Sequence, residues 1–185
     1  MSKSRGQSSA PFEVLIAVII MGFVLLMGIQ AIEFLSKQQC KAQIKSEASD
    51  LKAAVQNAIR GDSVVLNFFP PQCFDEEREM QLRRVASRAS CRSICEKEMD
   101  ECLFFTYRAE DFGYDLCLDN APIYTDFLDS SNCQDLGSDY VLIDFLNPSN
   151  SGGNPVLERG VYTLQNKTGS AETVPKICAY YYNQT

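Results

Sequence analysis

The stretch FEVLIAVIIMGFVLLMGIQAIEFLSKQQCKAQIKSEASDLKAAVQNAIR, residues 12–60, decides the fold of this chain. Its first half carries acids at Glu13 and Glu33, and the 19 residues between them include one strongly polar side chain, Gln30. An α-helix rises about 1.5 Å per residue, so this half is long enough to cross a bilayer core about 30 Å thick. We therefore predict a transmembrane helix over residues 13–35, preceded by a short cytoplasmic leader over residues 1–12.

Two other interpretations of the apolar half remain open. A cleaved secretory signal has a shorter apolar region of about 7–15 residues, followed by a cleavage site with small residues in an A-x-A-like pattern. Here the chain continues as IEFLSKQQCKAQIK, which contains no such site. The other interpretation is a core helix buried within the protein. The length of the apolar run favours a permanent anchor over both.

The second half of the stretch has the pattern of an amphipathic helix. No proline or glycine interrupts it between Leu35 and Arg60, and Gly61-Asp62 supplies a stop signal. We predict one continuous helix of about 45–50 residues, whose stem half covers residues 36–61. The stem's apolar stripe is expected to pack on the protein's own globular domain, and the stem of another chain is the alternative. Spacings of three and four residues place on that stripe Ile44, Ala48, Leu51, Val55 and Ala58 or Ile59.

The chain contains eight cysteines, and all of them follow the apolar half. An even number spread over the distal part, without a CxxC motif, indicates disulfides in an oxidising compartment. We therefore place the N-terminus inside the cell and the residues after about 36 outside it. Two acceptor sequons for glycosylation, at Asn166 and Asn183, agree weakly with this orientation. The disulfide candidates are Cys40, Cys73, Cys91, Cys95, Cys102, Cys117, Cys133 and Cys178.

The composition excludes several classes of function. No histidine is present, which removes Ser–His and Cys–His catalysis and His-ligated metal sites. Residues 101–185 hold 4 Lys/Arg against 12 Asp/Glu, so this half is a poor match for nucleic acid. The aspartates of residues 109–158 form no D-x-D-x-D-G loop, and a solvated acidic surface is the expected state. We expect no enzyme activity, no catalytic residue, no metal site and no cofactor.

Residues 62–185 are expected to form an extracellular, cysteine-rich α+β domain. Its β-rich runs predict strands at 63–69, 103–108, 114–118, 140–145, 160–165 and 177–182, with a long loop at 147–155. One further helix is expected over residues 75–101, with Asp75, Glu76 and Glu77 in its first turn.

Three arginines, Arg84, Arg88 and Arg92, would form a stripe on that helix. Cys91 and Cys95, four residues apart, would share one of its faces and reach different elements. Cys40 would tie the stem to the domain, with Cys178 as one candidate partner. The predicted fold class is therefore α+β: a long N-terminal helix, half transmembrane and half amphipathic, that carries a disulfide-rich antiparallel β head with one further helix.

The layout resembles that of archaeal type IV pilin-like proteins. Their precursors carry a short basic leader that ends in glycine, followed by a Gln-x-Ser-x-Glu pattern before an apolar helix. Here Lys3 and Arg5 precede Gly6, and Gln7 and Ser9 match the next positions. The resemblance implies cleavage between Gly6 and Gln7. The family's glutamate would fall at position 11, which is a proline, so Glu13 is the candidate assembly acid, two residues late. In the family this acid pairs with the amino terminus of a neighbouring subunit.

The chain also resembles small cysteine-rich, single-anchor proteins encoded by tiny-genome archaea. The residues that carry this resemblance are PFEVLIAVIIMGF at the anchor, PPQCFDEE after the stem and KICAYYY near the end. It implies a layout and no activity. Two functions follow as expectations: a pilin-like filament subunit or surface adhesin, or an anchored binding protein of the envelope that does not assemble. The expected partners are membrane lipid and copies of the chain itself through the N-terminal helix, with an unidentified extracellular partner.

Overall fold

We describe the protein from a computed structural model. The described residues are 10–61, 63–74, 77–109, 112–119, 125–128, 132–133, 136–137, 139–142, 157–169 and 171–182. The chain divides into two compact units, of which the first ends at Lys41 and the second runs from Ala42 to Thr185. We call the second unit the head.

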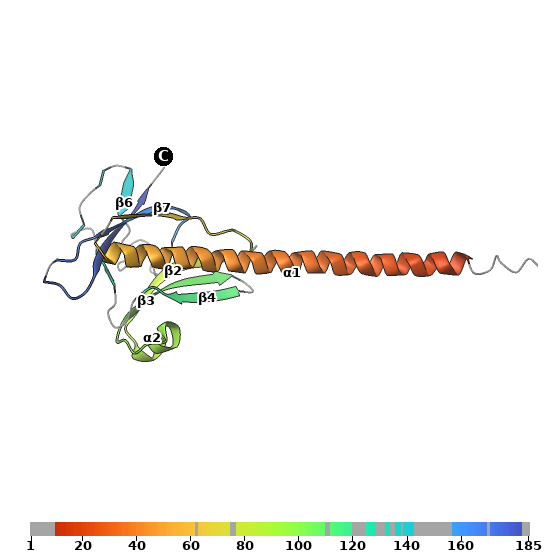
Figure 1. The fold of residues 1–185 in the computed structure, drawn as a ribbon, viewed down its shortest axis with the longest axis horizontal. Coiled ribbons are helices and arrows are strands. Elements are labelled where there is room, and N and C mark those ends of the chain that lie inside the picture. Colours follow the sequence, from red (N-terminus) through yellow and green to blue (C-terminus); the bar gives the residue numbers. More distant parts are fainter. Residues whose placement is uncertain are drawn as a thin grey trace, which may run out of the picture. The chain divides into compact units, whose positions relative to one another are not determined.

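Helix α1, Ala10–Ile59, is 50 residues long and is drawn as one uninterrupted coil in Figure 1. Its length confirms the prediction of one continuous helix of about 45–50 residues. The helix ends just before Gly61, whose φ of 120° lies in the left-handed region that glycine adopts without steric cost. The stop signal in the sequence was therefore identified correctly.

The first sheet of the head has five strands and is mainly antiparallel. Its order is β1 (Val64–Phe68), β7 (Gly160–Asn166), β8 (Lys176–Tyr182) and β5 (Asp126–Phe127), and β6 (Tyr140–Leu142) also pairs with β8. The last strand, β8, is antiparallel to β7 and β6 and parallel to β5. The C-terminal strand is thus the centre of this sheet.

The second sheet is an antiparallel meander of β2 (Glu77–Val85), β3 (Cys102–Ala109) and β4 (Phe112–Cys117). Helix α2, Arg88–Cys95, connects the first two of these strands. Its N-cap is Ser87, whose hydroxyl oxygen accepts a hydrogen bond from the backbone N–H of Ser90. The structure is therefore α+β, with a long N-terminal helix, antiparallel sheets and a second helix.

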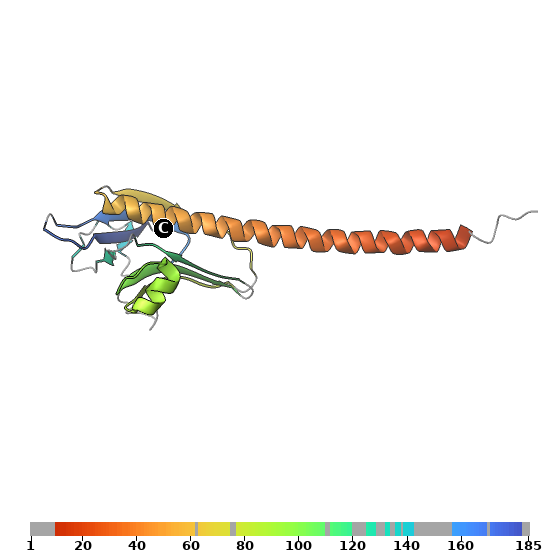
Figure 2. The same ribbon diagram turned by 60° about the horizontal axis from the view of Figure 1, so that its bottom comes forward.

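The apolar stripe of α1 forms part of the core of the head. In Figure 1 the strands β6 and β7 are drawn above the C-terminal part of α1, and β3 and β4 below it, and Figure 2 gives a second view of the same ribbon. The ring of Phe68 on β1 also packs edge-on against Phe105 on β3, at 6.0 Å between centroids. The prediction that the stripe packs within the protein's own domain is confirmed. Its members, each at most 6% exposed, are Ile44, Ala48, Leu51, Ala54, Val55 and Ala58.

Among the described residues, the predicted helix over residues 75–101 is confirmed at Arg88–Cys95 and wrong elsewhere, because residues 77–85 form a strand and residues 96–101 are not helical. Glu77–Val85 is a strand whose residues pair with β3, including Leu82 with Phe105 and Arg84 with Leu103. Leu82 is buried while its neighbour Arg83 is exposed, as expected for side chains that alternate across a sheet. The pairing with β3 outweighed the weak helical pattern. Of the acids assigned to the first helical turn, Glu77 begins β2, and residues 75 and 76 lie outside the described residues.

The predicted strands at 63–69, 103–108, 114–118, 160–165 and 177–182 agree with β1, β3, β4, β7 and β8 within two residues at each end. The predicted strand at 140–145 begins at Tyr140 as β6 and is described as far as Leu142. The predicted loop at 147–155 lies outside the described residues. The two-residue strand β5 was not predicted, because Asp126–Phe127 is too short to give a periodic signal.

Candidate functional site

The apolar part of α1 is the feature of the chain that most clearly needs a partner. Among the described residues, α1 is the one helix long and apolar enough to span a membrane, and none of its most apolar window is buried. Seventeen large apolar side chains between Phe12 and Leu35 are 42–68% exposed. Side chains of this kind cover every side of the helix, which is typical of a segment surrounded by lipid or by other apolar helices.

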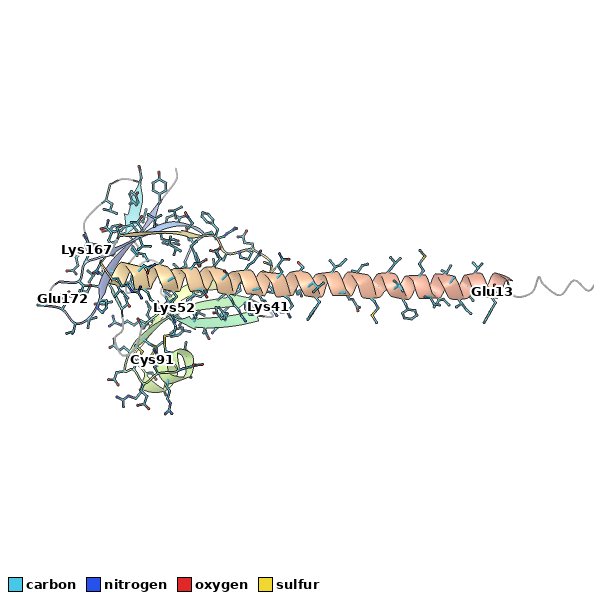
Figure 3. The ribbon with its side chains drawn as sticks, in the orientation of Figure 1. Glu13, Lys41, Lys52, Cys91, Lys167 and Glu172 are labelled. Carbon is cyan, nitrogen blue, oxygen red and sulfur yellow. A yellow bond between two sulfur atoms is a disulfide. The ribbon has the colours of Figure 1, made fainter. Side chains whose placement is uncertain are left out.

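Glu13 is the acidic residue in the first turn of α1, labelled in Figure 3. Its side chain is exposed. An ionisable side chain at the start of an apolar segment is costly to bury alone and calls for a partner or an aqueous boundary. The proposed cleavage between Gly6 and Gln7 lies outside the described residues, so the processing of the leader stays a prediction.

All eight cysteines are disulfide-bonded. Within the head, Cys91 pairs with Cys102, Cys95 with Cys117, and Cys133 with Cys178. Cys40 and Cys73 are also disulfide-bonded. The suggested partnership of Cys40 with Cys178 is therefore wrong, because Cys178 on β8 is bound to Cys133. The paired state indicates that the head matures in an oxidising compartment.

Helix α2 is attached to the second sheet by two of these bonds. Cys91 and Cys95 lie four residues apart on one face of the helix, and their partners, Cys102 and Cys117, lie on β3 and β4. This confirms the prediction that the two cysteines share a helical face and reach different elements. Cys91 and Cys102 lie in a small apolar cluster with Met99 and Phe104. Figure 3 labels Cys91 on this helix.

The arginine stripe expected on one helix does not exist. Arg84 lies on β2 and forms ion pairs with Glu101 and Asp126. Arg88 and Arg92 lie on α2 and face Asp100 and Glu98, at 2.8 and 3.6 Å. The exposed fractions of the four side chains in the two α2 pairs are 67–82%, so these pairs add little stability. Each of the three arginines has an acidic partner, so they do not form a common basic surface for a ligand.

Asp119 is a buried acid in the tract that was expected to be solvated. It is 4% exposed, and its two carboxylate oxygens accept hydrogen bonds from the backbone N–H groups of Leu103 and Thr125, at 2.5 and 2.7 Å. Burial raises the pKa of Asp119, and the two backbone hydrogen bonds act in the opposite direction. This aspartate therefore joins the start of β3 to the segment that leads into β5.

The other described acids of this tract have mainly local roles. Asp115 forms an ion pair with Arg108 across the β3–β4 hairpin, and Asp126 pairs with Arg84. Among the described residues, no group of three or more His, Cys, Asp and Glu side chains is arranged to hold a metal ion. The prediction of a solvated acidic surface is thus wrong for Asp119, because its carboxylate satisfies two buried backbone donors.

The first sequon lies at the junction between β7 and the end of α1. The side-chain amide of Asn166 donates a hydrogen bond to the carbonyl oxygen of Ile59 at 2.9 Å, and its Oδ1 accepts one from the N–H of Thr168. The hydroxyl oxygen of Thr168 in turn accepts a hydrogen bond from the backbone N–H of Lys176. Asn166 thus satisfies one of the terminal carbonyls of α1. The second sequon asparagine, Asn183, lies outside the described residues, and glycosylation at either position stays a prediction.

Besides the short strand β5, sequence reasoning missed the strand β2 and the role of Asp119. The alternation of Met80 and Leu82 with polar neighbours was a readable signal for a strand. Asp119 follows β4 directly, but its burial depends on strands that are distant in the sequence, so no local pattern could have indicated it.

No protein-family model matches this chain, and neither a curated protein nor a solved structure matches it.

Proposed function

We propose that this chain is a membrane-anchored extracellular structural or interaction protein, built like a pilin, that serves as a filament subunit or a surface adhesin. One observation carries the proposal. A single helix, Ala10–Ile59, exposes a largely apolar surface in its first half and is part of a disulfide-bonded head in its second half. A helix of this kind suits an anchor or an assembly element whose attached domain lies in an oxidising space.

The proposed topology places the N-terminus in the cytoplasm and the head outside the cell. The absence of free cysteines among the described residues supports the location of the head, because cytosolic thiols are kept reduced. The basic residues on both sides of the apolar segment do not discriminate between orientations, with Lys3 and Arg5 before it and Lys37, Lys41 and Lys45 after it.

The experiment that tests this proposal is an intact-mass measurement on protein from its native membrane, alkylated without reduction. A processed, pilin-like subunit should lack residues 1–6 and begin at Gln7. The same spectrum should show no alkylated cysteine. Eight alkylated cysteines would contradict the extracellular placement, and a retained leader would contradict processing of the pilin type.

A second candidate function is an anchored binding protein of the envelope that does not assemble. The observation that favours it is the position of Glu13, two residues later than in the pilin-like pattern. Size measurement in mild detergent separates the two functions. A filament subunit should sediment as a polymer, and Glu13→Gln should weaken that polymer, because Glu13 is the candidate assembly acid. A non-assembling protein should be a discrete particle with or without the substitution. Glu33→Gln is the matched control at the other end of the apolar segment.

A further inference from the structure

The edge strand β1 is unusual among the edges of the two sheets. Among the described residues β1 pairs with β7 alone, so one side of the strand has no described partner. Natural edge strands usually carry charges, proline or a bulge that prevents pairing with another chain. β1 has the sequence VVLNF, which contains no charged residue and no proline. Its register with β7 is continuous over five residues, so it has no bulge.

The other edge strands are protected by charge or by shortness. β2 and β4 form the edges of the second sheet, and they carry charged residues such as Arg83 and Asp115. In the first sheet β5 begins with Asp126, and β6 has three residues. The strand β1 is therefore the longest edge without a charged residue among the described strands.

The outer face of β1 carries exposed apolar side chains and no charge. Among the described residues of the head, three large apolar side chains are exposed: Val65 at 63%, Phe69 at 48% and Val141 at 50%. Val65 and Phe69 lie on or just after β1 and are four residues apart, so they project on the same side of the strand. The residues of β7 opposite this face are Thr163, which pairs with Val65, and Val161, which pairs with Asn67. The two strands together form an uncharged surface in a head with 13 Lys/Arg and 22 Asp/Glu, a net charge of −9.

We propose that β1 is a contact between heads, at which the β1 edge of a second copy of this chain adds to the first sheet. Two heads of net charge −9 repel each other wherever their acidic surfaces meet. Strands β1 and β7 carry no charged residue, so this surface is where two heads can approach with the least repulsion, and the nearby carboxylate of Glu47 accepts the N–H of Phe69 just after β1. A cationic partner would instead be drawn to the acidic surfaces and would gain nothing from an uncharged edge. A second copy supplies the same uncharged strand, with one edge that has no described strand partner.

This contact is too small to hold two heads together on its own. Five residues of strand extend about 17 Å, whereas a stable interface uses about 20–30 residues from each partner. Anchoring both copies in one membrane raises their effective concentration and allows a weak contact to form. The inference therefore rests on the proposed function, in which α1 anchors the chain and brings copies together.

The test uses the full chain reconstituted in lipid vesicles with a photoreactive amino acid at Asn67, which is exposed on β1. A photo-dimer is expected from position 67, well above the level from a photoreactive residue at Val141, which reports chance encounters. Val65→Lys should lower the dimer at least tenfold by placing a charge on the edge. Val141→Lys is the matched control, because Val141 is similarly exposed on a different strand, and it should leave the dimer unchanged. Both variants should unfold like the original protein, since neither residue is buried.

A second photoreactive position at Leu26 in α1 separates this inference from the proposed function. A dimer through Leu26 without one through Asn67 would overturn the β1 contact and leave helix-mediated assembly in place. A dimer at Asn67 that persists in Val65→Lys would also overturn the β1 contact. No dimer at either position would overturn both. Loss of the Asn67 dimer in Val65→Lys, with or without loss of the Leu26 dimer, would support the contact.

Discussion

The two halves of helix α1 share one backbone conformation but differ in which of their side chains are exposed. Between Phe12 and Leu35 the large apolar side chains are 42–68% exposed, whereas in the head Ile44, Leu51 and Val55 are at most 4% exposed. The second half places its lysines and acids away from one narrow stripe, and the first half has no polar side to turn outward. A helical backbone is therefore compatible with a protein core and with an apolar solvent alike. A helix with one apolar stripe packs that stripe on a protein core, whereas a helix that is apolar on every side requires apolar surroundings.

The largest expected effect comes from placing the same charge in each half. Leu51→Asp should lower the free energy of unfolding of the head by about 5 kcal/mol, because it combines a core cavity with a buried charge. Leu25→Asp should leave the stability of the head unchanged and should weaken membrane insertion by about 2.5–3.5 kcal/mol. Urea unfolding followed by tyrosine fluorescence measures the first quantity, and extraction from vesicles at high pH measures the second. Equal effects of both variants on the unfolding of the head would show that the two halves of α1 do not have different surroundings.

The disulfides should stabilise the head without affecting the anchor. Replacing Cys133 and Cys178 with alanine opens a loop with a sequence separation of 45, and replacing Cys91 and Cys102 opens one of 11. The chain-entropy account predicts losses of about 4 and 3 kcal/mol for the two double variants. Thermal unfolding of the head measures both losses. Membrane extraction should be the same for both variants and for the original protein, and a change in extraction would show that the anchor depends on the head.

Asp119→Ala should destabilise the head by about 2–4 kcal/mol, because two buried backbone N–H groups lose their acceptor. The matched control is Asp115→Ala, a partly exposed aspartate paired with Arg108, which should cost less than about 1 kcal/mol. Urea unfolding of both variants checks the difference. Similar losses would mean that the carboxylate of Asp119 is not the acceptor that holds β3.

The same aspartate predicts a dependence of stability on pH. Burial raises the pKa of Asp119 in the folded head, so the folded state keeps this proton at pH values where the unfolded chain has released it. The stability that this group contributes is complete below its ordinary pKa and is lost as the pH rises through the raised value. The free energy of unfolding of the original protein should therefore fall relative to that of Asp119→Asn as the pH rises from acidic to neutral, because asparagine does not titrate. Parallel pH dependences would rule out the raised pKa.

Asn166→Ala should have the smallest effect, a loss of about 1 kcal/mol from the bond to the terminal carbonyl of α1 at Ile59. Hydrogen exchange at the last turn of α1 should accelerate in this variant, while exchange in the turns between Phe12 and Leu35 should not change. Faster exchange in both regions would indicate that the two halves of the helix unfold together.

Elements with a strong local period could be predicted from the sequence. The continuous helix α1 could be predicted, because its first half is an unbroken apolar run and the apolar residues of its second half recur at spacings of three and four. The pattern also placed five strands within two residues of their observed ends. The sequence misled where local and distant preferences disagree. EREMQLRRV has good helix formers, but pairing with β3 holds it as the strand β2.

The roles of individual charged residues were harder to predict. Arg84, Arg88 and Arg92 have helical spacing, yet the first lies on a strand and the other two on α2. Asp119 is surrounded in the sequence by other acids, and its burial depends on Leu103, sixteen residues earlier. The disulfide pairing could not be predicted from the sequence either. Eight cysteines allow 105 pairings, and the choice depends on which strands are neighbours in the fold.

The most direct test of the account is protease treatment of intact cells from outside, followed by mass measurement of the fragment that stays with the membrane. We predict that the protease degrades the head under reducing conditions, and that the protected fragment contains the apolar part of α1. The start of that fragment, at Met1, Ser2 or Gln7, also reports whether the leader is removed. A full-length chain that resists protease until the membrane is opened would contradict the account, and so would a chain found in the soluble fraction.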